Sequence, residues 1–283
     1  MAPAAALRAP QAAGRSGLFR LLGFGGLLLG ASLGLSGARA GEIQATAGAL
    51  GLGTQVNGVA GGSCSSGTCA ISGGTAAGSN QFHRLSSFDT RGGITGVSID
   101  AAGFRNVILG VISPQGSFLD KPLSLSGGGN LIWLSPGGIH LSGGYAFNGI
   151  SQLTLSTATG LRLGDGLFDV LRTTASQATT LSSAPLAGPG GLLSDPTSLQ
   201  GIGLTRNGDL SIDGGLLTVD SSLLLDAQGG NVLLQGARIQ APAISVQGQS
   251  VAQGATLTAA GAQGGQVSLE AAGNLISSAP INA

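Results

Sequence analysis

Residues 227–232 read AQGGNV and residues 262–267 read AQGGQV, so one motif of small and amide side chains recurs 35 residues later. Each copy precedes an apolar run of strand length and then a corner that carries glycine. The runs Ala243–Val246 (AISV) and Ala255–Thr258 (ATLT) repeat the same rhythm between the copies. Such self-similarity is typical of a solenoid, whose coils bury their inward side chains against one another.

The chain after Gly41 follows the same pattern of short apolar runs and turn formers. Runs of four to seven residues bounded by Asn-Gly, Asp-Gly or Pro-Gly are typical of β-strands, and no stretch sustains a helical apolar stripe over ten residues. We therefore expect an all-β chain built as a β-helix; a sandwich or barrel with similar turn spacing is the alternative. The expected strands cover 106–112, 130–134, 153–157, 209–213, 216–219, 223–226, 231–234 and 266–269.

The composition excludes several protein classes. Glycine accounts for 53 of 283 residues and charged residues for 8%, against a usual charged share of about 25%. A hydrophobic share of 42% argues against disorder along the whole chain, and the near absence of Glu and Lys excludes a coiled coil. Twelve basic and twelve acidic residues leave no electrostatic footprint for nucleic acid, so we expect no nucleic-acid partner.

The first forty residues have the three parts of a secretory signal peptide. Three arginines, with no acidic residue among them, precede an uncharged apolar run over 21–35. An Ala-Arg-Ala cleavage site follows this run. We predict a signal peptide over 1–40 that is cleaved before the mature chain. An uncleaved anchor is the alternative, although 21–38 only just reaches the roughly 18 residues that suggest a membrane span. The cleavage residues are Ala38, Ala40 and Gly41.

Both cysteines lie in the exported part, in the segment Cys64-Ser-Ser-Gly-Thr-Cys69. An oxidising compartment favours a disulfide between them. The alternative is a metal site, but two thiols need further ligands and the sequence offers His83 and His140 alone. We predict the disulfide, worth at most about 2 kcal/mol for so small a loop, and no cofactor.

Three ordered motifs carry a family resemblance. Residues 69–88 read CAISGGTAAGSNQFHRLSSF, 127–139 read GGGNLIWLSPGGI and 153–158 read LTLSTA. Together they resemble the secretion domain of two-partner-secretion exoproteins, the filamentous-haemagglutinin-like family, over about 42–169. The resemblance implies a right-handed parallel β-helix with an N-terminal cap and a secretion domain over 41–178. We expect further irregular β-helix coils over 179–283 and no separate passenger, although the family usually carries a long region beyond this domain.

The resemblance also implies a route of export. Such domains are recognised in the periplasm of a Gram-negative-type cell by the POTRA domains of an outer-membrane β-barrel transporter, cross it unfolded and fold outside. We therefore expect a secreted or cell-surface protein. The alternative is a short adhesin or structural β-helix, or a truncated remnant of a larger adhesin. It would bind a host or cell-surface ligand or stack on another copy through an open end. An enzyme is not expected, because no cluster of Asp, Arg or Lys is visible.

The motif residues either contact the transporter during recognition or stabilise the turns and core of the β-helix. His83 is expected to cap a buried corner rather than act as a base, and Asn130 to join a polar ladder rather than meet the transporter. The chain departs from the family pattern at Gln81 for Leu, Arg84 for Ser, and Ser-Pro-Gly-Gly at 135–138 for Asn-Pro-Asn-Gly. The full set is Asn80, Phe82, His83, Asn130, Leu131, Ser135, Pro136 and Gly138.

Four aspartates cluster near the repeats and raise the question of calcium. The calcium-binding pattern G-G-x-G-x-D is absent from the sequence. We therefore expect a solvated acidic face. Its members are Asp209, Asp213, Asp220 and Asp226.

Overall fold

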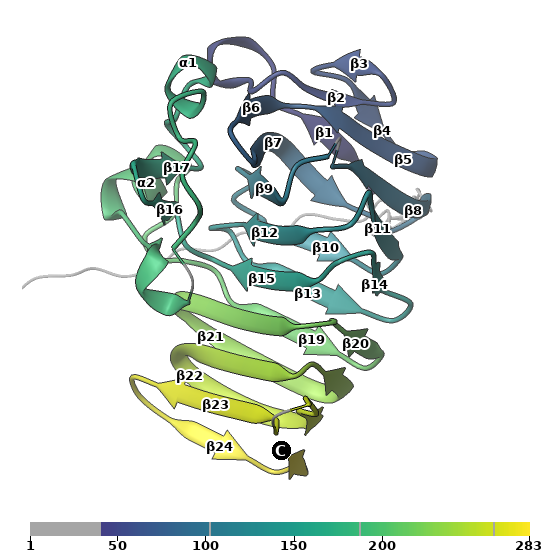
Figure 1. The fold of residues 1–283 in the computed structure, drawn as a ribbon, viewed down its shortest axis with the longest axis vertical. Coiled ribbons are helices and arrows are strands. Elements are labelled where there is room, and N and C mark those ends of the chain that lie inside the picture. Colours follow the sequence, from purple (N-terminus) through teal and green to yellow (C-terminus); the bar gives the residue numbers. More distant parts are fainter. Residues whose placement is uncertain (1–40, 102, 187, 263) are drawn as a thin grey trace, which may run out of the picture. The chain divides into compact units, whose positions relative to one another are not determined.

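The computed structural model describes residues 41–101, 103–186, 188–262 and 264–283. The predicted signal peptide, with Ala38 and Ala40, lies outside these residues. The described chain is an all-β solenoid of about 9 turns with parallel stacked coils, 56% strand and 7% helix (Figure 1). The predicted β-helix architecture is confirmed. No helix among the described residues is long and apolar enough to cross a bilayer.

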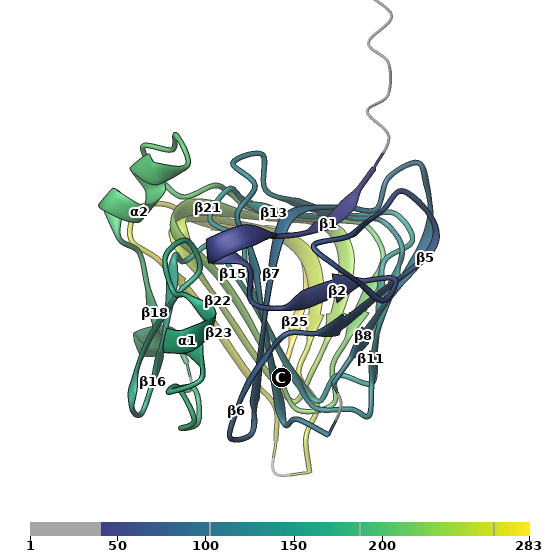
Figure 2. The ribbon, with the colours of Figure 1, turned by 90° about the horizontal axis from the view of Figure 1, so that it is seen from above.

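Each coil has three sides, which Figure 2 shows in cross-section. The first side contains β7 (Asn80–Asp89), β9 (Asn106–Val111), β12 (Asn130–Leu134), β15 (Gln152–Ser156), β23 (Gln266–Ala271) and the beginnings of β21 (Ser222–Gln240) and β22 (Ala243–Thr258). The second contains β10 (Ser117–Leu119), β13 (Ile139–Ser142), β19 (Leu210–Asp213), the middle of β21 and of β22, and β24 (Leu275–Ser277). The third contains β5 (Ser66–Gly73), β8 (Gly93–Asp100), β11 (Pro122–Ser126), β14 (Ala146–Asn148), β20 (Leu216–Thr218), the ends of β21 and β22, and β25 (Ile281–Asn282).

The pairing register gives the coil length that the sequence left open. Along the first side, Asn80, Asn106, Asn130 and Gln152 are register partners at intervals of 26, 24 and 22 residues. The recurrence at 35 residues is therefore longer than one coil. Val232 of the first copy lies on the second side and Val267 of the second copy lies on the first side. The two copies of the motif therefore form the same kind of corner at two different places in the coil.

Inward side chains fill the solenoid with aliphatic groups. Leu131 and Trp133 of β12 point into this core, where the Trp133 ring packs against Phe88 with centroids 4.4 Å apart. Phe168 is the last aromatic residue of the chain, so the later coils depend on Leu, Ile, Val and Ala. Each fully buried Leu or Val contributes about 1.5–3 kcal/mol, which allows a core with few aromatics to hold the coils together.

An N-terminal cap closes the first coil with antiparallel strands, as the fold prediction requires. β1 (Ile43–Ala45) pairs with β7 and with β4 (Ser63–Cys64), and β2 (Thr54–Val56) pairs with β5 and with β3 (Val59–Ala60). A 3-10 turn at Gly48–Leu50 links β1 to β2, and β6 (Thr75–Ala77) forms a hairpin with β7. Antiparallel pairing satisfies the edge that the first parallel strand would otherwise expose.

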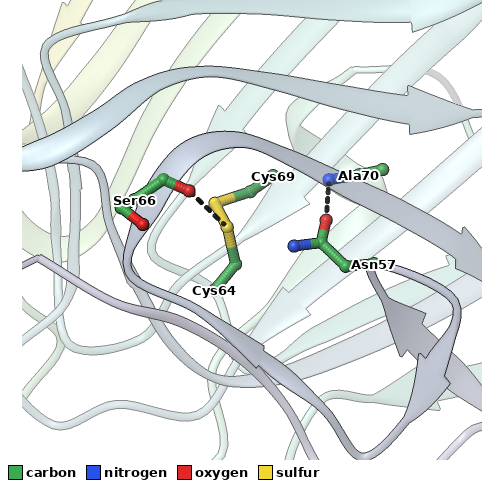
Figure 3. The surroundings of a disulfide bond; sticks show 5 residues. All are labelled: Asn57, Cys64, Ser66, Cys69 and Ala70. Carbon is green, nitrogen blue, oxygen red and sulfur yellow. Dashed lines mark hydrogen bonds between the residues drawn. A yellow bond between two sulfur atoms is a disulfide. The ribbon is translucent and has the colours of Figure 1, made fainter.

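The predicted disulfide lies in this cap (Figure 3). Cys64 of β4 is bonded to Cys69 of β5, with Cα atoms 5.7 Å apart. Beside it, the Asn57 Oδ1 accepts a hydrogen bond of 2.8 Å from the backbone N–H of Ala70. The four residues between the cysteines are exposed, whereas both cysteines are buried. The disulfide is therefore a staple inside the cap that holds an exposed loop.

Residues 157–186 and 188–206 leave the coil, and we call them the excursion. Gln152 of β15 pairs with Ser222 of β21, 70 residues later. The excursion holds an antiparallel sheet of β16 (Gly160–Leu163), β17 (Gly166–Asp169) and β18 (Leu192–Leu193), the helices α1 (Ala175–Ala178) and α2 (Pro196–Gly201), and a 3-10 turn at Pro189–Gly191. The expected domain boundary after residue 178 falls inside it, at the end of α1, and the coils resume at β19.

Candidate functional site

A second hydrophobic core lies outside the solenoid, between the first side and the excursion. Outward side chains of the first side meet apolar side chains of the excursion there, and the rings of Phe82 and Phe168 lie 4.9 Å apart. On a bare coil these outward groups would face solvent, but Phe82 is fully buried. The main members are Phe82, Ile108, Ile132, Leu134, Leu161, Phe168, Leu181 and Leu192.

Asn80 begins a ladder of three amides on the same side. Its Nδ2 donates to the carbonyl oxygens of Leu181 at 2.9 Å and Ser183 at 2.7 Å, and both acceptors belong to the excursion. Its Oδ1 accepts from the Nδ2 of Asn106 at 2.8 Å, and the Asn106 Oδ1 accepts from the Nδ2 of Asn130 at 2.9 Å. Asn80 is fully buried and Asn130 is half-buried. The ladder thus joins three coils to the excursion.

Arg84, which stands where the pattern of the two-partner-secretion family has serine, links three parts of the molecule. Its guanidinium donates to the carbonyl oxygens of Leu50 in the cap, Asp169 at 3.2 Å and Thr173 at 2.7 Å in the excursion. The guanidinium also lies 5.9 Å from the Phe168 ring centroid. Burial lowers the pKa of Arg84 to about 10, and the nearby Asp169 charge opposes that change. The Arg84 side chain therefore stays protonated at neutral pH. Its hydrogen bonds connect the cap, the first coil and the excursion.

His83 points beneath the cap and is fully buried. Its Nδ1 lies 3.4 Å from the Thr54 Oγ1. Burial lowers the pKa of His83 to about 4, with a weaker opposing effect of Asp100, so the ring is neutral at neutral pH. The His83 ring therefore lies at a packed, solvent-excluded position beside the cap.

The corner at 135–138 packs against backbone on two sides. The Ser135 carbonyl accepts from the Gly138 N–H at 2.9 Å, and the Pro136 carbonyl accepts from the Gly208 N–H at 2.8 Å. A Cβ on Gly137 would lie 2.3 Å from the Ser113 carbonyl oxygen. The asparagine of the family pattern therefore does not fit at Gly137 without movement of the neighbouring coil.

Ser135 and Gly138 of this corner, and Leu131 of β12, also have packing or backbone roles. The Ser135 Oγ accepts a buried hydrogen bond of 2.9 Å from the Ser117 Oγ. Gly138 has a φ of +120°, which L side chains rarely adopt. Leu131 lies in the solenoid core. The structure thus places these motif residues in the core or at a packed corner.

The expectation of a solvated acidic face is wrong for Asp226. Its carboxylate is buried and accepts hydrogen bonds from the Ser156 Oγ at 2.7 Å, the Gln247 Nε2 at 2.7 Å and the Gln228 Nε2 at 3.2 Å. Burial raises the pKa of Asp226, and these hydrogen bonds oppose the rise. Asp213 and Asp220 are exposed as expected. Within the described residues, no group of three His, Cys, Asp or Glu side chains is placed to hold a metal ion.

Sequence reasoning missed the excursion and the role of Arg84. One signal for the excursion was available: Thr174 and Gln177 have the spacing of a helix capping box, and the structure contains that box at α1. Asp195 before Pro196 is a second helix-start signal, realised at α2. Arg84 gave no comparable signal, because its acceptors are backbone carbonyls far away in the sequence.

Comparison with known proteins leaves the family open. No family model matches the chain, and no curated protein matches it. The relation to two-partner-secretion exoproteins therefore stays a prediction from the motifs.

Proposed function

We propose that the chain carries the export domain of a two-partner secretion system. In this proposal the POTRA domains of an outer-membrane β-barrel transporter recognise it in the periplasm, and it reaches the medium or the cell surface. The supporting observation is the placement of the family-like motifs. Residues 80–88, 130–134 and 153–156 of these motifs lie on β7, β12 and β15, which together with β9 are consecutive hydrogen-bonded strands of one sheet. Most of the residues in these stretches thus lie on neighbouring strands of one side of the coil, while residues 69–73 lie on β5 of another side.

Under this proposal, burial of the motif side chains decides whether the transporter recognises the chain before or after it folds. Asn80, Phe82 and His83 are fully buried in the folded chain. A transporter cannot contact these side chains once the cap and the excursion have closed over them. Recognition through them must therefore precede folding, as the expected passage of an unfolded chain requires.

The fold also suits a chain that folds while it emerges. Each coil pairs with its sequence neighbours, and the cap closes the N-terminal end. A solenoid can nucleate at one end and propagate. The excursion is the exception, because it packs back on β7 from about 100 residues further along. We expect the first coils to form before the excursion docks on them.

A location assay tests the proposal. The full chain is expressed with the β-barrel transporter encoded nearest its gene, without it, and with a transporter that lacks its POTRA domains. We expect the protein in the medium or on the cell surface with the intact transporter alone. Retention in the periplasm under all three conditions, with Gly41 as the mature N-terminus, would overturn the proposal.

A further inference from the structure

A groove of about 940 Å³ runs along the first side of the solenoid, between its outward face and the excursion. Its floor crosses six paired strands, from Asn106 on β9 to Gln266 on β23. At a strand spacing of about 4.8 Å, the floor is about 24 Å long. One wall is aliphatic and comes from the excursion, where Leu186 is exposed and Leu161 and Leu192 are buried behind it. In Figure 2 the excursion stands beside this side of the coil.

The floor presents polar side chains that make no hydrogen bond to the part of the chain that the structure describes. The amide ladder ends at Asn130, and the next residues of the same column are Gln152 and Ser222. With Ser245 in the neighbouring column and Gln266 further on, they line the groove. The side chains of Gln152, Ser222, Ser245 and Gln266 have no hydrogen-bond partner among the described residues. Amide and hydroxyl groups both donate and accept, which is the chemistry that recognises hydroxyl groups.

The charge and spacing of the groove narrow the class of ligand. Arg105 is the one charged residue among the described residues that line it, so a polyanion or polycation finds no complementary set of charges. The polar groups recur at about 4.8 Å, one set for each coil. An extended chain of pyranose sugars advances by nearly this distance per sugar, whereas an extended peptide advances by about 3.3 Å per residue.

From these observations we infer that the groove binds an extended, uncharged oligosaccharide of about five sugars, aligned with the solenoid axis. Sugar hydroxyls bond the free amides and hydroxyls of the floor, and the C–H face of a ring packs against the exposed Leu186 of the excursion. The inference concerns the folded protein and does not depend on the proposed export route.

Calorimetric titration of the folded, mature chain tests the inference. The probes are uncharged cello-, manno- and chito-oligosaccharides of two to six units. We expect at least one series to bind, with affinity that rises with each unit to about five and then levels off. Gln152→Ala and Ser245→Ala should each weaken binding roughly fivefold, the effect of one neutral hydrogen bond. Gln249→Ala is the matched control, because this exposed amide lies outside the groove and should leave binding unchanged.

Three results would overturn the inference: no binding by any of the three series at millimolar concentration, equal binding by the Gln152→Ala variant, or equal binding by a polygalacturonate of the same length. Binding of an extended Gly-Ser peptide in place of the sugars would assign the groove to a polypeptide and would also overturn it. Circular dichroism of each variant shows whether the solenoid is intact, so a loss of binding can be separated from a loss of fold.

Discussion

The side-chain amide of Asn80 lies 2.9 Å from the carbonyl oxygen of Leu181, although 101 residues separate them in the sequence. This contact joins the first coil to a segment that is synthesised much later. Ser183 supplies a second carbonyl to the same amide at 2.7 Å. Asn80, which lies in a motif that resembles the two-partner-secretion family, is therefore one of the residues that hold the excursion against the first coil.

Replacing Asn80 should destabilise the protein strongly. Asn80→Ala leaves the carbonyls of Leu181 and Ser183 and the amide of Asn106 without a partner, and an unsatisfied buried group costs about 1–3 kcal/mol. We expect the free energy of unfolding in urea to fall by about 3 kcal/mol. Asn148→Ala is the control, since its exposed amide makes one long bond of 3.4 Å to Ser124, and its effect should stay below about 0.5 kcal/mol. Equal effects of the two changes would contradict this role.

Replacing Arg84 with serine should loosen the excursion. Arg84→Ser removes three hydrogen bonds to the carbonyls of Leu50, Asp169 and Thr173, and bonds from a charged group contribute about 1.5–3 kcal/mol each. Hydrogen exchange should become faster at the amides of β17 and α1, with β21 and β22 unchanged. The control is Arg162→Ser, because Arg162 is exposed on β16. Unchanged exchange in the excursion of Arg84→Ser would show that the arginine is not its anchor.

Replacing Gly137 with asparagine should also destabilise the fold. Its Cβ would lie 2.3 Å from the Ser113 carbonyl oxygen and 2.6 Å from the Gly116 nitrogen, so the adjacent corner must move. Overpacking of this kind costs about 1–3 kcal/mol. Thermal unfolding of Gly137→Asn and Gly190→Ala compares a crowded position with an open one, since a Cβ on Gly190 meets nothing within 4 Å. If both variants unfold at the temperature of the parent, the corner is not tightly packed.

The buried His83 should make the protein less stable in mild acid. Its pKa is about 4 in the folded chain against an ordinary 6.5, so the unfolded chain takes up the proton first. The stability from the neutral ring is present above pH 6.5 and is lost as the pH falls toward 4. The loss amounts to about 3 kcal/mol. Denaturant unfolding between pH 7 and 4 should show a flatter pH dependence in His83→Gln than in the parent.

His140→Gln is the control for that experiment. His140 is half-buried and its Nδ1 bonds the Ser211 Oγ at 2.8 Å. Burial lowers the pKa of His140 as well, and the charges of Asp209 and Arg91 act in opposite directions on it. The substitution should therefore change the pH dependence less than His83→Gln does. A profile of His83→Gln that matches the parent would show that His83 does not control the acid response.

The sequence predicts the architecture because local rules determine it. Short apolar runs between turn formers become strands, as at β12 and β19, and the small loop between Cys64 and Cys69 is closed by the expected disulfide. The antiparallel cap is also present, as the family resemblance implies. These features depend on residues close together in the chain or on a pattern that many residues share.

The excursion and the coil length could not be predicted in the same way. Leu161 and Leu163 look like solenoid strand residues, and their place outside the coil is decided by packing against Phe82 and Ile108, over 50 residues away. The repeated Ala-Gln-Gly-Gly motif marks two different corners, so its spacing does not give the coil length. Asp226 looks like a surface acid, and its burial depends on Ser156 in the preceding coil. Long-range pairing decides all three features.

The most direct test of the proposed export role compares the unfolded chain with the folded one as ligands of the transporter. Soluble POTRA domains of the β-barrel transporter are titrated with chain freshly diluted from denaturant and with chain allowed to fold. We predict binding to the unfolded chain that disappears as Asn80, Phe82 and His83 become buried. Folded chain that binds as tightly as unfolded chain, or unfolded chain that binds no better than an unrelated denatured protein, would contradict the proposal.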